Sequence, residues 1–213
     1  MNFLGVRSLQ HILYFVLVGL LISCTTQRHS VPQSRDVESP LASKSGFPFG
    51  AFPIKKGELG NIRIGMTISE AEAHLPPMER VTDHATNFGF GGGSPAFLYY
   101  SNDEAVLGLI PKLDTDTLLF ILAIHPQLRT SHGLHPKASV AELQQIDPDL
   151  TIYWDMMNEW EVYFDEVNHW EFVFMTDSNR RIGQYPDLEK PSKPIRTTTT
   201  ADWLTIFGEK QLQ

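Results

Sequence analysis

The sequence predicts an α+β domain whose antiparallel sheet is built from two units, each a short helix followed by a three-stranded meander. Three observations carry this prediction: two capping boxes, apolar runs of β-forming residues after each of them, and turn residues between those runs. An α+β arrangement follows because helices can bury their apolar stripe against one face of such a sheet.

The first unit begins with a short helix within residues 60–77. Thr67 and Glu70 have the spacing of a capping box, in which each side chain accepts a hydrogen bond from the other residue's backbone N–H. Pro76 ends this helix because proline cannot continue it. Three β-forming runs then follow, at residues 96–101, 104–110 and 117–125.

The second unit repeats this order. Ser139 and Glu142 form the capping box, and the helix stops before Pro148. Strands are expected at residues 151–155, 159–165 and 169–175. The matching positions of caps and prolines indicate an internal duplication, with repeats at residues 60–126 and 132–185.

Alternation predicts which strand residues face the core. In residues 159–165, one face would carry Trp160, Val162 and Phe164, and the other Glu159, Glu161, Tyr163 and Asp165. Trp170, Phe172 and Phe174 are expected to repeat the inward pattern. The chain would end with an edge strand at residues 197–200 and a short helix at residues 201–207 that stops at Gly208.

The stretch Leu21-Ile22-Ser23-Cys24 follows an apolar run with Arg7 upstream, and Cys24 is the single cysteine of the chain. It resembles the lipobox of bacterial lipoproteins. This resemblance implies a signal peptide over residues 1–23, cut before Cys24, and acylation of Cys24. Because Thr25 rather than aspartate follows the cysteine, it also implies sorting to the periplasmic face of the outer membrane. An ordinary secretory signal that contains a cysteine is the alternative.

Residues 24–46 would comprise the lipidated cysteine and a disordered tether, because residues 25–46 are polar and rich in turn formers. The globular domain would then cover residues 47–213. Of 17 basic residues Arg7 lies in the signal, which leaves 16 against 25 acidic ones. This negative balance opposes binding to nucleic acid. An acylated Cys24 would leave no thiol for a disulfide, a nucleophile or a metal.

The domain also resembles known envelope proteins. Ile62, Ile64, Gly65, Met66 and Thr67 resemble the Gly-Met-Thr turn before the helix in the β-barrel assembly lipoprotein E and in the β-lactamase-inhibitory proteins, which share a helix-and-meander module. Residues 121–126, Thr130, Gly133 and residues 141–143 resemble the RpoE-regulated lipoprotein family. These resemblances imply an envelope protein with a helix-and-meander fold.

Candidate chemical groups are few. The glycine-rich stretch 88–94 lacks the spacing of a nucleophile elbow or a phosphate loop. His125, His132 and His135 would need to converge to bind a metal. The acidic pairs Asp114 with Asp116 and Glu161 with Asp165 are typical of a solvated face, and Trp154, Trp160 and Trp170 of a core. The sequence therefore predicts no catalytic residue, no cofactor and no metal.

Phe47, Phe49 and Phe52 alternate with turn formers and are either a lead-in segment over the core or a contact for a partner. The leading hypothesis is a non-enzymatic lipoprotein that acts in envelope assembly or homeostasis through contacts with an envelope protein. The alternative is a periplasmic inhibitor or ligand-binding module that uses Gly89, Gly91, Gly92 and Gly93, which would let a ligand approach the backbone closely.

Overall fold

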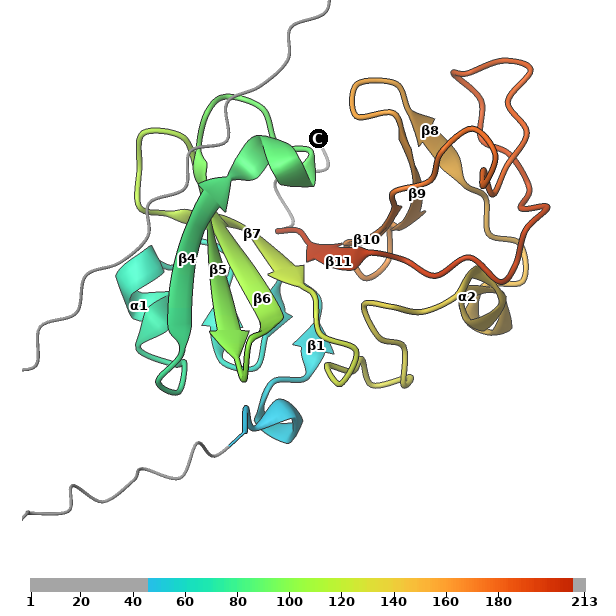
Figure 1. The fold of residues 1–213 in the computed structure, drawn as a ribbon. Helices are drawn as coiled ribbons and strands as arrows, with labels where there is room; N and C mark the ends of the chain where they lie inside the picture. The colour runs from blue at the N-terminus through green and yellow to red at the C-terminus, as the bar shows by residue number, and fades with distance from the viewer. Residues whose placement is uncertain (1–45, 209–213) are drawn as a thin grey trace, which may run out of the picture. The chain divides into compact units, whose positions relative to one another are not determined.

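The structure, a computed structural model, describes residues 46–208 (Figure 1). The predicted signal peptide, Cys24 and almost all of the predicted tether lie outside these residues, so the assignments made for them stay predictions. The described part is mainly β, with two short α-helices.

An eight-stranded antiparallel sheet forms the centre of the fold, with the strand order β4-β5-β6-β7-β11-β10-β9-β8. Its strands are β4 (Glu79–His84), β5 (Pro95–Ser101), β6 (Glu104–Pro111), β7 (Leu118–Ala123), β8 (Tyr153–Asp155), β9 (Trp160–Asp165), β10 (Trp170–Phe174) and β11 (Trp203–Ile206). A second antiparallel sheet has three strands, β1 (Ile54–Lys55), β2 (Glu58–Leu59) and β3 (Ile62–Arg63). The prediction of an antiparallel sheet is confirmed.

The last strand in chain order lies in the middle of the large sheet. β11 pairs with β7 through Leu204↔Ala123 and Ile206↔Ile121, and with β10 on its other side. The predicted helix over residues 201–207 is therefore wrong, because Leu204 and Ile206 alternate into the core while β7 and β10 supply hydrogen-bonding partners for the backbone. The predicted edge strand at residues 197–200 reduces to an isolated bridge between Ser139 and Thr200.

Both predicted capping boxes are confirmed. α1 (Ile68–Glu72) has Thr67 as its N-cap, and α2 (Val140–Ile146) has Ser139. In each box the hydroxyl accepts from a glutamate N–H and the glutamate carboxylate accepts from the cap N–H. The cap residues also form bridges to the segment that precedes a central strand, Thr67 to Thr117 and Ser139 to Thr200. These contacts attach the start of each helix to the sheet.

The first unit contains four strands, not the three that were predicted. α1 is followed by four strands, because residues 79–84 form β4 at the edge of the sheet. All six residues of β4 carry exposed or half-buried side chains, so the apolar run that marks the other strands is missing there. α2 is likewise followed by four strands once β11 is included.

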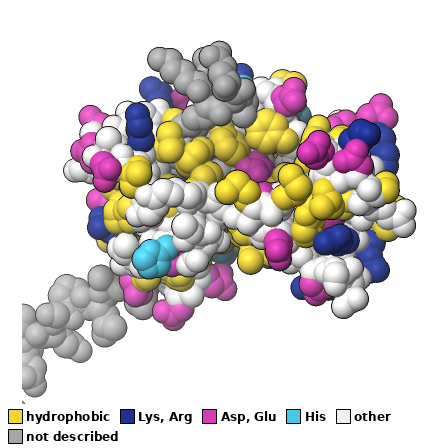
Figure 2. Space-filling view, turned by 90° about the horizontal axis from the view of Figure 1, so that it is seen from above, with side chains coloured by type: hydrophobic (Ala, Val, Ile, Leu, Met, Phe, Trp, Pro, Cys, Tyr) yellow, Lys and Arg dark blue, Asp and Glu magenta, His cyan; other side chains and the backbone are white. Residues whose placement is uncertain are grey.

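Apolar side chains cover both faces of the large sheet. On one face, α1, α2 and the small sheet pack against a core that includes Leu107, Ile121 and Phe172. The other face carries Trp160, Val173 and Trp203 under the 3-10 helix η2 (Ala85–Phe88). Seen from above, on the side where the helical turn after β4 lies in Figure 1, hydrophobic side chains form a band (Figure 2).

Because both faces of the large sheet are buried, the prediction of which β9 side chains share a face with those of β10 is wrong. Phe172 is directly opposite Tyr163, and Val173 is opposite Val162. Trp160, Val162 and Phe164 therefore lie on the face opposite to Trp170, Phe172 and Phe174. The alternation within each strand was right, but alternation cannot say which face is inward when both faces are covered.

Candidate functional site

A buried and extensively hydrogen-bonded polar feature of the fold is the carboxylate of Glu161, which projects from β9 and has no exposed surface. It accepts hydrogen bonds from the backbone N–H groups of Ile182, at 2.8 Å, and Gly183, at 2.8 Å. The hydroxyl groups of Thr176, at 2.5 Å, and Tyr185, at 2.8 Å, donate to the same carboxylate. Four donors from residues 176–185 thus converge on one buried charge and fix the shape of this loop.

Two neighbouring groups share the environment of Glu161. Burial, and then the hydrogen bond to the Glu161 carboxylate, raise the pKa of Tyr185, so its hydroxyl remains a donor. The guanidinium of Arg181 lies 4.1 Å from the centre of the Trp154 ring, a cation–π geometry. Trp154 is half-buried, whereas Trp160 and Trp170 are buried in the core as predicted.

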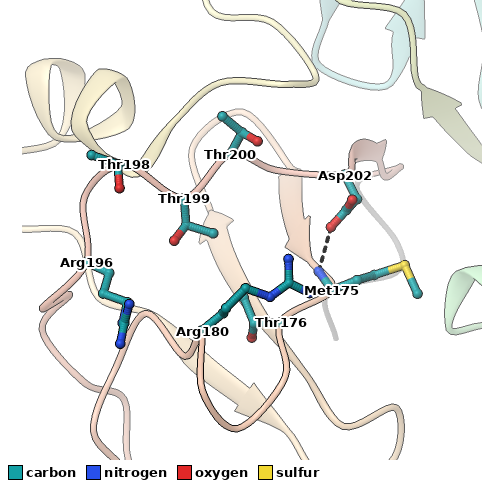
Figure 3. Close-up of a pocket in the computed structure, with 8 residues that line it drawn as sticks. All are labelled: Met175, Thr176, Arg180, Arg196, Thr198, Thr199, Thr200 and Asp202. Atoms are coloured by element: carbon teal, nitrogen blue, oxygen red, sulfur yellow. Dashed lines mark hydrogen bonds between the residues drawn. The ribbon is translucent and has the colours of Figure 1, made fainter.

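The loop held by Glu161 forms one side of a pocket of about 380 Å³, here called the arginine pocket (Figure 3). Its lining residues are Met175, Thr176, Arg180, Arg196, Thr198, Thr199, Thr200 and Asp202. Figure 3 shows the row of threonines on one side and the Arg180 side chain extending from the other. The pocket therefore combines guanidinium groups, hydroxyl groups and a carboxylate in one hollow.

The threonine row is attached to the start of α2. The carbonyl oxygen of Thr199 accepts from the N–H of Val140, at 3.0 Å, and that of Thr197 accepts from the N–H of Ala141, at 2.8 Å. These are two of the N–H groups that the first turn of a helix leaves without an intrahelical partner. One wall of the arginine pocket is thus set by α2 and the opposite wall by Glu161 in β9.

The charges in the arginine pocket are mixed. Arg180 donates from Nε to the Asp177 carboxylate at 2.9 Å, and Asp202 accepts from the N–H of Met175 at 2.6 Å. Within residues 46–208 the Arg196 side chain makes no ion pair. Two guanidinium groups and the Asp202 carboxylate line the pocket, and Asp177 lies outside the lining. Such a mixture suits a surface that itself carries both signs of charge.

The surrounding segment concentrates the positive charge of an acidic chain. Residues 175–202 carry five basic side chains, those of Arg180, Arg181, Lys190, Lys193 and Arg196. Figure 2 shows dark-blue side chains gathered at its right-hand end, the side on which Figure 1 draws this segment in orange to red. The same range carries four acidic residues, so its formal charge is +1 in a chain of net charge −8. This local change of sign is the signal that the sequence offers for the site.

The glycine-rich stretch 88–94 packs on the protein's own sheet. Phe88 meets Trp203 edge to face, and Phe90 stacks on Phe120 with ring centres 4.0 Å apart. A Cβ at Gly89 would lie 2.7 Å from Cζ2 of Trp160, so this glycine allows a close approach to the indole. Gly91, Gly92 and Gly93 remain exposed at the tip.

The three phenylalanines of the predicted partner contact differ in exposure. Phe47 and Phe52 are buried in the main core, and Phe49 is half-buried. Phe49 stacks on His125 with ring centres 4.4 Å apart, and it lines a separate cavity of about 220 Å³. A role in partner contact stays a prediction, with Phe49 as the residue that has surface to offer.

The predicted histidine and acid candidates do not meet at one point. His125 pairs with Glu104 at 2.8 Å, and His135 lies 3.4 Å from Glu142 in the second capping box. Within residues 46–208, no three His, Cys, Asp or Glu residues form a group that could hold a metal ion. Glu161, which was assigned to a solvated face, is buried instead.

Neither α-helix of residues 46–208 is long and apolar enough to cross a membrane. α1 has five residues and α2 has seven, so neither approaches the length that crosses a bilayer.

Comparisons with known proteins give a structural similarity and no sequence match. No protein-family model matches this chain, and no curated protein matches its sequence. Among solved structures, the chain is similar to the crystal structure of the uncharacterized protein yfeY from Escherichia coli. The TM-score is 0.49 and the sequence identity is 12%, over 73% of this chain and 98% of that chain.

Proposed function

We propose that this protein is a non-enzymatic lipoprotein, anchored through Cys24 at the periplasmic face of the outer membrane, that acts in envelope assembly or homeostasis by contacting another envelope protein. The sequence Leu21-Ile22-Ser23-Cys24 supports the anchor. The arginine pocket is the surface that supports the contact, because it offers guanidinium and carboxylate groups together.

One observation carries this proposal. The carboxylate of Glu161 is fully buried, and its four donors all belong to the loop that forms the arginine pocket. A buried carboxylate is costly unless it is fully hydrogen-bonded, so an apolar residue in β9 would be the simpler way to fill the core. A fixed loop shape that presents Arg180, and whose Ile182 carbonyl oxygen accepts from the N–H of Arg196 at 3.3 Å, accounts for the presence of a charge there.

Site-specific crosslinking in intact cells tests the contact. A photoreactive residue placed at position 196 or 198 is expected to give one discrete crosslinked envelope protein, identical for both positions. Position 114, exposed in the turn before β7, serves as the control. The crosslink should disappear when Glu161 is replaced by Ala and persist when the exposed Glu166 is replaced by Ala. Equal crosslinking from position 114 would contradict the proposal.

Replacing Cys24 by Ala tests the anchor. The variant is expected to lose the acyl mass at its amino terminus and to leave the outer-membrane fraction, because acyl chains supply the stable attachment. If the variant still sediments with the outer membrane after a high-salt wash, acylation of Cys24 is not what holds the protein there.

A periplasmic inhibitor or ligand-binding module remains the second candidate function. The observation that favours it is the exposed tip of the glycine-rich stretch, where Gly92 and Gly93 have positive φ and a Cβ at Gly93 would meet no other atom within 4 Å. Crosslinking from position 91 or 93 to a soluble periplasmic protein, with none from position 196, would favour this candidate over the first.

We also propose that the two halves of the domain are copies of one ancestral unit, as the paired capping boxes suggest. Further support comes from the far end of each helix. The Tyr99 hydroxyl of β5 donates to Glu72 at the end of α1, and the Tyr163 hydroxyl of β9 donates to Asp147 at the end of α2. In each half a tyrosine from the second strand thus ties down the helix end.

A further inference from the structure

A second cavity differs from the arginine pocket because it combines apolar walls with positive charge. It has a volume of about 220 Å³ and is bounded by the start of the domain and by the loop after β7. The half-buried Phe49 and Pro53 supply apolar surface over the buried Ile54, while Lys55 and Arg129 are exposed beside it. None of its lining residues is acidic, although the chain as a whole has a net charge of −8.

The frame of this cavity is held by backbone hydrogen bonds. The N–H of Ile54 donates to the carbonyl oxygen of Arg129 at 2.8 Å, and Ile54 and Thr130 form a parallel bridge. The N–H of Thr130 donates to the carbonyl oxygen of Leu134 at 2.9 Å. Stacking on His125 fixes the Phe49 ring. The cavity is therefore preformed, as small-molecule sites usually are.

The hydroxyl group of Thr130, at this cavity, lacks a hydrogen-bond partner within residues 46–208. Its side chain lines the cavity and is only 5% exposed, yet its hydroxyl has no hydrogen-bond partner in the described part of the chain. A buried hydroxyl without a partner is unfavourable, and such groups commonly mark the place of a ligand or an ordered water. The hydroxyl oxygen itself has almost no accessible surface, so a bound molecule can reach it only when the Thr130 side chain rotates toward the cavity. In that rotamer the hydroxyl can donate to a carboxylate oxygen.

We propose that this cavity binds a small apolar carboxylate, that is, an aryl group or a short alkyl chain bearing one carboxylate. The apolar body would pack against Phe49 and Pro53. The carboxylate would meet Arg129 and, after rotation of the Thr130 side chain, its hydroxyl, with Lys55 adding attraction at the entrance. The volume lies below that of drug-sized sites, which restricts the ligand to roughly ten non-hydrogen atoms. This site is independent of the protein contact proposed above.

Calorimetric titration of the full-length protein in mild detergent tests the proposal, with phenylacetate as the probe and phenylacetamide as its neutral counterpart of equal size. Phenylacetate is expected to bind with a dissociation constant on the order of 0.1–1 mM, and phenylacetamide at least ~10-fold more weakly. Titration of detergent alone corrects for partitioning. Absence of binding at millimolar phenylacetate, or equal binding of phenylacetamide, would overturn the proposal.

Three variants locate the site. Arg129→Gln should weaken phenylacetate binding by about 10-fold, while Arg63→Gln, which removes an exposed arginine of β3 outside the cavity, should leave it within about two-fold. Thr130→Val should also weaken binding, yet raise the melting temperature of the unliganded protein, because it removes a buried hydroxyl that lacks a partner. Unchanged binding in both Arg129→Gln and Thr130→Val would contradict this location.

Discussion

At the residue scale, the stability of the loop that forms the arginine pocket depends on a single carboxylate. Glu161→Ala would leave the N–H groups of Ile182 and Gly183 and two hydroxyl groups without their acceptor. We expect a loss of about 3 kcal/mol in the free energy of unfolding, measured by urea denaturation. Glu166→Ala, at an exposed turn, should change it by less than about 0.5 kcal/mol.

Limited proteolysis gives a local measure of the same change. Arg180 and Arg181 lie in the loop held by Glu161, so trypsin should cut there much faster in Glu161→Ala than in the wild-type protein. Equal cutting rates would mean that the loop keeps its shape without the carboxylate.

Glu171 makes the stability of the fold depend on pH. Its side chain is half-buried, and burial, followed by the negative charge of Asp155, raises its pKa from 4.5 to about 7. The folded state therefore binds a proton that the unfolded state releases between about pH 4.5 and 7, so stability should fall as pH rises through this range and level off above it. Glu171→Gln should remove this fall and gain on the order of 2 kcal/mol at pH 8.

Urea denaturation of both proteins at pH 5 and pH 8 tests this expectation. The gain should be present at pH 8 and small at pH 5, where the Glu171 carboxyl of the folded wild type is protonated. Parallel pH profiles for the two proteins would show that Glu171 titrates at its ordinary pKa in the folded state.

Glu161 and Glu171 also show how far the direction of a single side chain could be predicted from the sequence. Glu161 and Glu171 lie in apolar strands where alternation alone marks a glutamate as outward. Glu161 points into the main core because residues far along the chain, from 176 to 185, bring donors to it. Such long-range compensation leaves no local pattern, so sequence reasoning placed Glu161 on a solvated face.

At the element scale, the capping boxes are the features that the sequence predicted best, because both partners lie three residues apart and need no tertiary contact. Ser139→Ala and Thr67→Ala should each lower the free energy of unfolding by about 1 kcal/mol. Ser69→Ala, on an exposed position inside α1, should leave it nearly unchanged. Equal effects of Thr67→Ala and Ser69→Ala would mean that the first cap contributes little.

Gly89 and Gly93 form a matched pair within the glycine-rich stretch. Both have positive φ, but a Cβ at Gly89 would lie 2.7 Å from the Trp160 ring, whereas a Cβ at Gly93 would meet nothing within 4 Å. Gly93→Ala should cost about 1 kcal/mol for the backbone conformation alone, and Gly89→Ala at least ~2 kcal/mol because the loop or the ring must also shift. Urea denaturation of the two variants measures the difference.

The strands differ in how far sequence could predict them. β5, β6, β9 and β10 follow from apolar, β-forming runs between turn residues. β4 carries no buried side chain, and β11 was assigned to a helix because its four residues offer too little periodicity to distinguish the two states. Only the unpaired edges of β7 and β10 determine that residues 203–206 are extended.

At the scale of the whole molecule, residues 46–208 are expected to unfold in one transition. The two halves share the β7–β11 pairing and a single main core, in which Leu107 and Phe172 belong to different halves. All four tryptophans lie at position 154 or later, and Trp160 and Trp203 also pack on residues 88–89 of the first half, so their fluorescence reports on the second half and on its contact with the first. Fluorescence and far-ultraviolet circular dichroism should therefore give the same urea midpoint. Two separate midpoints would show that the halves unfold independently.

The central position of β11 has a consequence for how the protein reaches its final state. A chain that emerges amino terminus first exposes β7 and β10 before residues 203–206 are available to lie between them. Until then each half presents a bare strand edge, the kind of surface that pairs with other chains. During folding, the polypeptide would thus be most vulnerable to aggregation just before residues 203–206 arrive, which makes this interval the natural moment for help from a chaperone.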